Sequence, residues 1–477
     1  MNELLGQLGG GLYAVLAFAV LLGVVITVHE WGHFFVARRC GVKVLRFSIG
    51  FGPALWSRIG RDGTEYVVAA VPLGGYVKML DEREGEVAPE ELPRAFNRKP
   101  VAQRFAIVAA GPLVNLVLAV FVYWLLFVAG EIRLAPVIGS VERGSPAAVA
   151  GLEAGDEILA VDGHRIRSWD DLPLRVVARV GDTGSVRFDV QRGAAAVEQQ
   201  IAVPINAFLR GRESENPLSA LGLRPWMPPY EVEIGDVLPT VEIDGVSQPG
   251  PGHVAGLRKG DRLLRVDGRE IRGAPAWVDA VRSAPGRALA VEVARGGDVL
   301  TITLVPAVRL VDGRATGYAG VGSGGKVTLR FPEDWPEEYR REVRFGPLQA
   351  IAEAVRNTWE RSELTVVMIG KMISGALSTD SIGGPLTIAH GASVTMSIGP
   401  AAFLDFLALV SITIGILNLL PVPVLDGGHL LFYAVEAVRG RPLSERVQIA
   451  ATQVGLFMLL ALMALALFND YTRYLAP

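Results

Sequence analysis

Disulfide bonds and strong charge are both missing from this sequence. Its single cysteine, Cys40, excludes an intramolecular disulfide, so cysteine usage does not place the protein in a redox compartment. The 46 Lys and Arg residues nearly balance the 49 Asp and Glu residues, and no basic face suggests a nucleic-acid partner. Charged residues make up 20% of the chain and hydrophobic residues 50%, with a mean hydropathy of +0.35. We therefore expect a lipid bilayer as a partner, soluble domains beside the membrane part, and no nucleic acid.

Four apolar stretches are long enough to cross a bilayer, which takes roughly 20 helical residues. They run from Leu12 to about Ala37, from Ala106 to Ala129, from about Ile398 to Leu425 and from Val447 to Phe468. A signal peptide is the alternative for the first stretch. The acidic Glu3, the lack of Lys or Arg before the stretch and the lack of a small-residue cleavage site all disfavour it. Asp405 interrupts the third stretch without an evident reason.

The distribution of Lys and Arg predicts how the chain crosses the membrane. These residues are dense between the first two stretches, from Arg38 to Arg104, and recur at Arg439, Arg441 and Arg446. By the positive-inside rule both loops are cytoplasmic. The two termini and the long section between the second and third stretches then lie outside. Its many arginines do not contradict this, because long domains are translocated regardless of charge.

The long outside section contains an internal repeat. Residues 148–166 and 253–271 are identical at 11 of 19 positions without gaps, at an offset of 105 residues. This spacing predicts two tandem domains of about 90–105 residues. In each copy a short helix ends at a glycine, a Gly-Asp turn leads into a strand, and an Asp-Gly turn closes a hairpin.

The sequence His-Glu-Trp-Gly-His at 29–33 carries the strongest chemical signal. Residues four apart share one face of a helix, so His29 and His33 can bind one metal ion, with Glu30 beside them as a general base. Ionisable residues inside an apolar span cost about 2.5–3.5 kcal/mol each at its centre and usually mark function. The alternative is a set of polar residues that simply borders the span.

A zinc site needs a third protein ligand and an open position. Asp426 is the candidate, because the predicted topology brings the third stretch to the same side of the membrane as the two histidines. Pro421 and Pro423 break the helix just before it, as expected where backbone lines a cavity. His429 is a rival ligand.

Two β-rich segments follow the first stretch, Val44–Trp56 and Tyr66–Met79. They are interrupted by four glycines, Gly50, Gly52, Gly74 and Gly75. We expect a hairpin that dips toward the membrane and offers a free edge to a substrate strand. An ordinary cytoplasmic hairpin is the alternative.

Taken together, these motifs resemble the site-2 protease family of intramembrane zinc metalloproteases, over nearly the whole chain. The matching stretches are HEWGH (29–33), RFSIGFGPALW (46–56), GTEYVVAAVPLGGYVKMLDE (63–82), AAGPLVN (109–115), GGPLTIA (383–389), LDGG (425–428) and ALFND (466–470). The two repeats resemble bacterial, circularly permuted PDZ domains. Each has a later glycine-containing strand, in 219–226 and in 317–324, of the kind that borders a peptide groove.

The resemblance implies one Zn²⁺ held by His29, His33 and Asp426, with Glu30 as the general base. It implies that Asn418 contacts the substrate backbone or steadies the site. The implied substrate is a single-span anti-sigma factor already trimmed outside, with leftover signal peptides as a second class. The PDZ-like domains would act as a size filter and could bind peptide C-termini, or serve only as rigid spacers. The implied location is the bacterial inner membrane, with these domains periplasmic and the active site near the cytoplasmic side.

The expected fold is a polytopic α-helical membrane protein with four transmembrane helices, a membrane-associated β-hairpin and two α+β PDZ-like domains. The membrane helices are expected within residues 1–37, 105–130, 398–430 and 447–477. The other segments are a cytoplasmic loop with the hairpin at 38–104, the two domains at 131–228 and 229–326, amphipathic helices at 327–397 and a cytoplasmic loop at 431–446. A metal transporter and a catalytically inactive scaffold are the competing functions.

Overall fold

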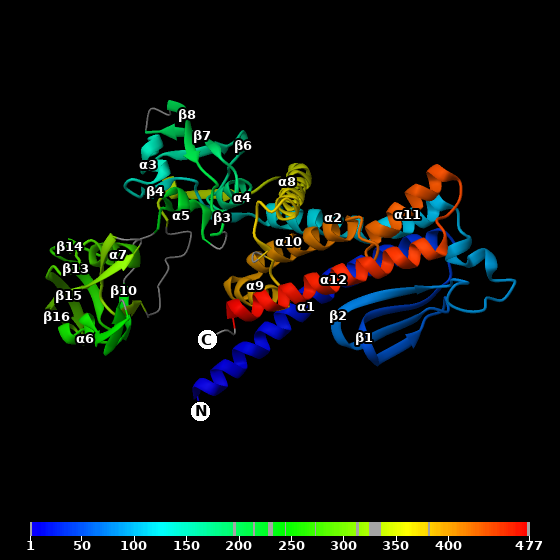
Figure 1. Ribbon diagram of the computed structural model, residues 1–477, viewed down its shortest axis with the longest axis horizontal. Coiled ribbons are helices and arrows are strands. Elements are labelled where there is room, and N and C mark those ends of the chain that lie inside the picture. Colours follow the sequence, from blue (N-terminus) through cyan, green and yellow to red (C-terminus); the bar gives the residue numbers. More distant parts are fainter. Residues whose placement is uncertain are drawn as a thin grey trace.

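A computed structural model describes residues 2–193, 197–212, 215–227, 232–243, 245–271, 273–311, 314–323, 335–379 and 382–474. Four of its helices are long and apolar enough to cross a membrane, which confirms the four predicted stretches. They are α1 (Asn2–Arg39), α2 (Val101–Ala129), α10 (Pro400–Leu419) and α12 (Glu445–Tyr474). These helices run side by side along the long axis of the molecule (Figure 1).

The third apolar stretch is divided into three helices. Ile398 ends α9 (Pro385–Ile398), and Gly399 separates that helix from α10. After Leu419 the two prolines break the chain, as predicted, and a new helix, α11 (Asp426–Arg439), begins at the expected metal ligand. The expectation of a loop at 431–446 is therefore wrong for most of its length. Its residues up to Arg439 are good helix formers, and the turn falls at Gly440, which caps α11 at φ 70°.

The carboxyl end of α12 is fastened to the start of α9. The buried carboxylate of Asp470 accepts hydrogen bonds from the backbone N–H groups of Gly384 (3.0 Å) and Leu386 (2.8 Å) and from the Thr387 hydroxyl (2.6 Å). The Asn469 amide donates to backbone carbonyl oxygens of the loop before α9, at 2.8 and 3.0 Å. Two matching stretches noted above, at 383–389 and 466–470, are thus parts of one contact.

The predicted hairpin is confirmed as two long strands, β1 (Val44–Ile59) and β2 (Glu65–Met79). Both strands bend, and each half pairs separately. Residues 44–49 lie between 75–79 on one side and 65–68 on the other, and 54–59 pairs outside 65–69. The two strands therefore form one sheet of four segments in the order 75–79, 44–49, 65–69 and 54–59, joined by three pairings. Residues 75–79 form an edge with which no other described strand pairs.

The two repeats fold as separate α+β domains with matching elements and antiparallel sheets. The first repeat domain contains β4 (Ile138–Val141), α3 (Pro146–Ala150), β5 (Glu157–Val161), β6 (His164–Arg165), α4 (Asp171–Val177), β7 (Gly184–Arg192), β8 (Val197–Ile205), α5 (Pro217–Leu221) and β9 (Leu223–Pro225). Its sheets have the orders β6-β5-β7-β8 and β4-β9. As predicted, α3 ends at a glycine, Gly151, at φ 92°.

The second repeat domain contains β10 (Val232–Val237), β11 (Thr240–Ile243), β12 (Val246–Pro249), α6 (Pro251–Ala255), β13 (Arg262–Val266), β14 (Arg269–Glu270), α7 (Ala274–Arg282), β15 (Leu289–Arg295), β16 (Asp298–Leu304), β17 (Ala307–Val311), β18 (Arg314–Tyr318) and β19 (Val321–Ser323). Its main sheet has the order β16-β15-β13-β10-β19, with β14 paired to β13. The expected domain boundaries at 228/229 and 326/327 lie outside the described residues.

One ion pair is repeated in both domains. Asp156 and Asp261, the aspartates of the two Gly-Asp turns, are each 1% exposed. Asp156 binds the guanidinium of Arg192 at the end of β7, and Asp261 binds that of Arg295 at the end of β15. Each pair has two hydrogen bonds of 2.6–2.7 Å. The same arginines bind the carbonyl oxygen of the helix-ending glycine in their own repeat, at 2.7 and 2.8 Å. Both domains thus contain the same ion pair between a buried aspartate of the repeat and a partly exposed arginine beyond it.

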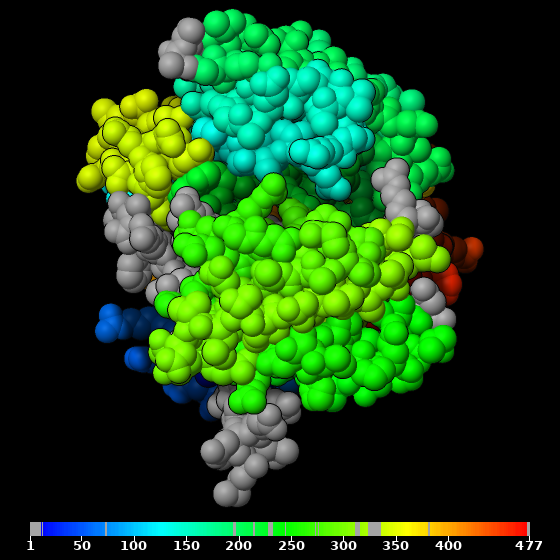
Figure 2. Space-filling model, turned by 90° about the vertical axis from the view of Figure 1, so that its left-hand side faces the viewer, coloured from blue at the N-terminus to red at the C-terminus, as the bar shows by residue number. Residues whose placement is uncertain are grey.

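Between the second domain and α9 the chain returns to the membrane helices. Strand β20 (Arg340–Val343) pairs with β3 (Glu131–Leu134), and α8 (Pro347–Ile373) follows as one helix rather than a helix pair. Figure 1 shows the repeat domains at one end of the helices and the β1–β2 sheet at the other, with α8 lying across the end near the domains. Figure 2 views the domain end, where the first domain lies above the second with a gap between them.

Candidate metal centre

Three predicted ligands meet where the carboxyl-terminal part of α1 lies beside the first residue of α11. His29 Nε2 lies 3.2 Å from Asp426 Oδ2, and His33 Nε2 lies 3.4 Å from the same oxygen. The two Nε2 atoms are 3.2 Å apart. Both histidines are 8% exposed. Among the described residues this is the one group of three or more His, Cys, Asp or Glu side chains placed to hold a metal ion.

The trio fits a zinc ion on two grounds. A tetrahedral zinc holds N and O ligands at about 2.0–2.1 Å, which separates the ligand atoms by about 3.3–3.4 Å. The three observed separations, 3.2–3.4 Å, match that spacing. In addition, Asp426 Oδ2 is buried without a hydrogen-bond partner, which is costly for a carboxylate oxygen unless a cation binds it.

Two glycines let α1 and α2 approach closely enough to build this site. A Cβ at Gly111 would lie 2.3 Å from His33 Nε2 and 2.9 Å from His29 Cε1, so any side chain there would clash with both histidine rings. A Cβ at Gly32 would lie 2.7 Å from the Ala110 carbonyl oxygen. The glycine inside HEWGH and the glycine of AAGPLVN therefore belong to one helix contact.

Helix α2 also orients the two histidine rings. His33 Nδ1 donates to the Ile107 carbonyl oxygen at 2.9 Å. His29 Nδ1 faces the side-chain amide of Asn115 at 3.3 Å, and Asn115 is fully buried. The amide atom nearest His29 is Asn115 Nδ2, while Asn115 Oδ1 is buried without a partner in the described part of the chain. When Nε2 binds a metal, Nδ1 carries the proton, so the amide turns over and its oxygen accepts from His29. Sequence reasoning missed both contacts, although an asparagine inside an apolar span was a usable signal.

Replacing Asn115 with Leu is expected to weaken zinc binding about 10- to 100-fold, because the His29 ring loses the group that fixes its orientation. Zinc titration against a competing chelator measures the affinity. Asn115→Asp should restore part of the loss, because a carboxylate also accepts from Nδ1. Unchanged zinc affinity in Asn115→Leu would contradict the assigned contact.

Glu30 lies beside the trio and borders an open cleft of about 560 Å³. Its side chain packs against β2, because a Cβ built on Gly75 would lie 3.1 Å from Glu30 Cγ. One wall of the cleft is the β2 segment 74–79, and the other includes Asn418, Val424 and Leu425. The predicted general base thus faces the same space as the metal ligands, without belonging to the ligand set.

The four glycines predicted to border the substrate divide into two pairs. Gly74 and Gly75 line the cleft, whereas Gly50 and Gly52 are not among its lining residues. Gly50 serves the sheet instead: it adopts φ 91°, and a Cβ there would lie 2.8 Å from the Val71 carbonyl oxygen. His429, the rival ligand, lines a separate cavity with Arg104 and Tyr433 and is not in the metal trio.

Comparison with known proteins identifies the family of the chain. The description "Peptidase family M50" matches residues 17–462. The chain belongs to this peptidase family. It is 46% identical over 462 residues to "Regulator of sigma-E protease RseP" of Salmonella typhimurium, covering 97% of this chain and 99% of that protein. It is 44% identical to the protein of the same name from Escherichia coli K12 and 41% identical to "Putative zinc metalloprotease" of Vibrio cholerae, with the same coverage.

Family membership and site geometry agree on the enzyme class. The protein is an intramembrane zinc metalloprotease. Its His-His-Asp trio has the donor set and the spacing that zinc requires. Neither competing function, transporter nor inactive scaffold, accounts for both the family and the position of Glu30.

Proposed function

We propose that the chain hydrolyses a peptide bond within the membrane segment of a single-span protein. The observation that carries this proposal is that the metal trio, Glu30 and the unpaired strand edge at 75–79 border one cleft. Its relatives' name, regulator of sigma-E protease, supports a role in sigma-E regulation with an anti-sigma factor as substrate. Remnant signal peptides are a second substrate class.

Glu30 supplies the acid–base chemistry in this proposal. Zinc, when held by His29, His33 and Asp426, would polarise a carbonyl group and make water more acidic. The Glu30 carboxylate takes a proton from the attacking water and returns it to the leaving amine. Contact with Gly75 on β2 keeps that side chain against the cleft.

A helical substrate hides its peptide bonds within its own hydrogen bonds. The free edge at 75–79 offers unpaired backbone groups to which an extended segment could add as a further strand. Asn418, on the opposite wall, has a side-chain amide that could satisfy substrate backbone groups. The cleft therefore suits an unwound, extended segment better than an intact helix.

The topology proposed from charge suits this arrangement. The arginine-rich β1–β2 end would be cytoplasmic and the repeat domains periplasmic, in a bacterial inner membrane. The active site, at the inner ends of α1 and α10, would then lie near the cytoplasmic side. The repeat domains are proposed to be PDZ-like, able to bind peptide C-termini.

The proposed reaction is tested with purified full-length chain and a single-span substrate in detergent or liposomes. Mass spectrometry of the products should place the cut inside the apolar segment, and a zinc chelator should abolish cutting. Proline substitutions that loosen the substrate helix should speed cleavage, because less unwinding is needed. Cuts confined to the soluble parts of the substrate would refute intramembrane cleavage.

The proposed size filter predicts a gain of activity. Deleting the second repeat domain, residues 229–326, should permit cleavage of a substrate that still carries a folded outside domain. This domain is preferred for deletion because the first is ion-paired to α8 through Arg167, Arg175 and Asp182. The trimmed substrate is the control and should be cleaved with or without the domain. If the untrimmed substrate resists the deletion variant while the trimmed one is cleaved, this domain is not the filter.

A further inference from the structure

Helix α8 presents three different faces. One packs on the membrane helices through Ala350, Ala354 and Thr358, which are buried. A second pairs with the first repeat domain through Glu353, Glu360 and Lys371. The third, on the side opposite the domain, is an apolar stripe that is 48–85% exposed at Leu348, Ile351, Val355, Trp359, Val366 and Ile373. Successive members are three, four or seven residues apart, so they lie along one side of the helix.

Helix α8 crosses the membrane helices near their outer ends. The Trp124 indole N–H donates to the Pro347 carbonyl oxygen at 3.0 Å, and Arg361 lies over the Tyr123 ring at 5.3 Å. Tyr123 precedes the end of α2 by six residues, or about 9 Å. The 29 residues of α2 extend for about 43 Å, close to the full thickness of a bilayer with its headgroups. The crossing therefore lies near the boundary between headgroups and acyl chains.

A helix with an apolar stripe at this depth has the properties of an interfacial membrane helix. The stripe lies on the side away from the soluble domain, where it would contact acyl chains. Trp359 is 71% exposed within it, and tryptophan favours the membrane interface. Polar groups on the flank between the stripe and the domain would then stand at the level of lipid headgroups.

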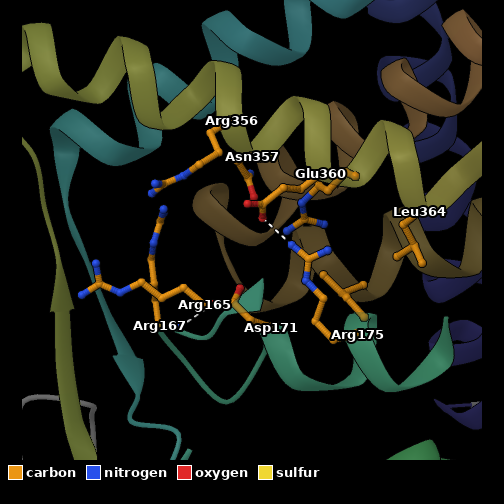
Figure 3. A pocket seen from close by; sticks show the side chains of 10 residues that line it. Arg165, Arg167, Asp171, Arg175, Arg356, Asn357, Glu360 and Leu364 are labelled. Atoms are coloured by element: carbon orange, nitrogen blue, oxygen red, sulfur yellow. Dashed lines mark hydrogen bonds and ion pairs between the residues drawn. The ribbon is translucent and has the colours of Figure 1, made fainter. Parts of the chain in front are cut away.

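A small pocket of about 70 Å³ opens between α8 and the first repeat domain at this level. Five arginines line it, against two carboxylates, Asp171 and Glu360. The arginines are Arg165, Arg167, Arg175, Arg356 and Arg361. Figure 3 shows the side chains of α8 and those of the domain converging on this space from opposite sides.

The carboxylates of the pocket are already engaged. Glu360 binds Arg175 at 2.5 Å, and Asp171 accepts the backbone N–H groups of Arg167 and Ser168 at 3.0 and 3.2 Å. Glu353, just outside the lining, pairs with both Arg167 and Arg356.

Several donors of the pocket remain unused. Among the described residues, Arg165 has no ion-pair partner and the Asn357 amide makes no hydrogen bond. Arg361 binds Asp405 through Nη2 at 3.2 Å, so the carboxylate inside the third apolar stretch has an ion-pair partner. The buried Nε of Arg361 has no hydrogen-bond partner among the residues that the structure describes. A surplus of arginine and amide donors in one concave site is the chemistry that binds phosphate.

We propose that this pocket binds the phosphate of an anionic phospholipid, whose acyl chains lie along the apolar stripe of α8. Arg165 and Arg356 bind the phosphate at the open side, and Asn357 and Arg361 donate from within. A free phosphate would share the donors but not the stripe, so the two sources are separable. The inference concerns lipid binding and does not depend on the proposed proteolysis.

The test uses the full-length chain purified in detergent, titrated with dioctanoyl phosphatidylglycerol and, separately, with inorganic phosphate. Native mass spectrometry counts bound lipid and gives the affinity. The double variant Arg165→Gln/Arg356→Gln should bind the lipid at least about tenfold more weakly than wild type. The control Arg143→Gln/Arg282→Gln removes the same charge from exposed positions outside the pocket and should bind like wild type. Unfolding temperatures confirm that each variant is folded.

A third variant, Trp359→Gln, separates the two sources of phosphate. It should weaken binding of the lipid and leave that of inorganic phosphate unchanged. Lipid affinity that is equal in wild type and in Arg165→Gln/Arg356→Gln overturns the site. Inorganic phosphate that binds as tightly as the lipid, with Trp359→Gln affecting neither, overturns the lipid assignment and identifies a free-phosphate pocket.

Discussion

Replacing Glu30 with Gln is expected to reduce cleavage by a factor of about 10² to 10⁴ while leaving zinc bound. Glutamine keeps the size of the side chain and loses the ability to accept a proton from water. Zinc should remain, because the three converging ligand atoms belong to His29, His33 and Asp426. Metal analysis and cleavage of a single-span substrate, performed on the same preparation, measure both quantities.

Two variants frame this experiment. Glu363→Gln changes an exposed carboxylate on α8, outside the cleft, and should cleave normally. Asp426→Ala should lose zinc and activity together, because two histidines alone leave the ion without its third protein ligand. Normal cleavage by Glu30→Gln would remove Glu30 from the base role, and loss of zinc in that variant would make it a structural residue instead.

A second large loss of activity is expected from a substitution at Gly111, which has no side chain. Gly111→Ala should sharply lower both zinc content and cleavage, because its methyl group would occupy the position of the His33 and His29 rings. Helix α2 cannot withdraw easily, since its backbone also receives the His33 Nδ1 hydrogen bond. Zinc per chain and the cleavage rate are again the measurements.

Gly23→Ala is the matched control for this glycine. It makes the same chemical change in α1, where a Cβ would meet nothing within 4 Å. Because alanine is favoured over glycine in a helix by about 1 kcal/mol, this control should be active and at least as stable as wild type. If Gly111→Ala retains full zinc and activity, the close approach of α1 and α2 is not what builds the site.

The convergence of the three candidate ligands was predictable because each signal is local or topological. His29 and His33 follow from helix periodicity, and Asp426 from its place at the same end of a parallel span. What sequence could not provide was the rotation of α2 about its own axis. That rotation decides that Asn115 and Ile107 face the histidine rings.

Other features escaped for the same reason, since they join segments far apart in the chain. Asp405 binds Arg361, and Asp470 binds the backbone at the start of α9. Both contacts depend on helix packing, which sequence periodicity does not predict. Helix α11 was not predicted, because the charged residues Arg439 and Arg441 indicated a loop. The paired halves of β1 and β2 were missed because bends within a strand depend on tertiary contacts more than on composition.

The arrangement of β1 has a mechanical consequence. Residues 44–49 follow α1 after only four residues, Cys40–Lys43, and are held by strand pairing on both flanks. Glu30 and the 75–79 edge are therefore connected twice, through the short α1–β1 segment and through the contact of Glu30 with Gly75. A bulky segment can then be admitted only if the opposite wall, Asn418–Leu425, moves. Such a movement widens the cleft and leaves the position of Glu30 relative to the 75–79 edge unchanged.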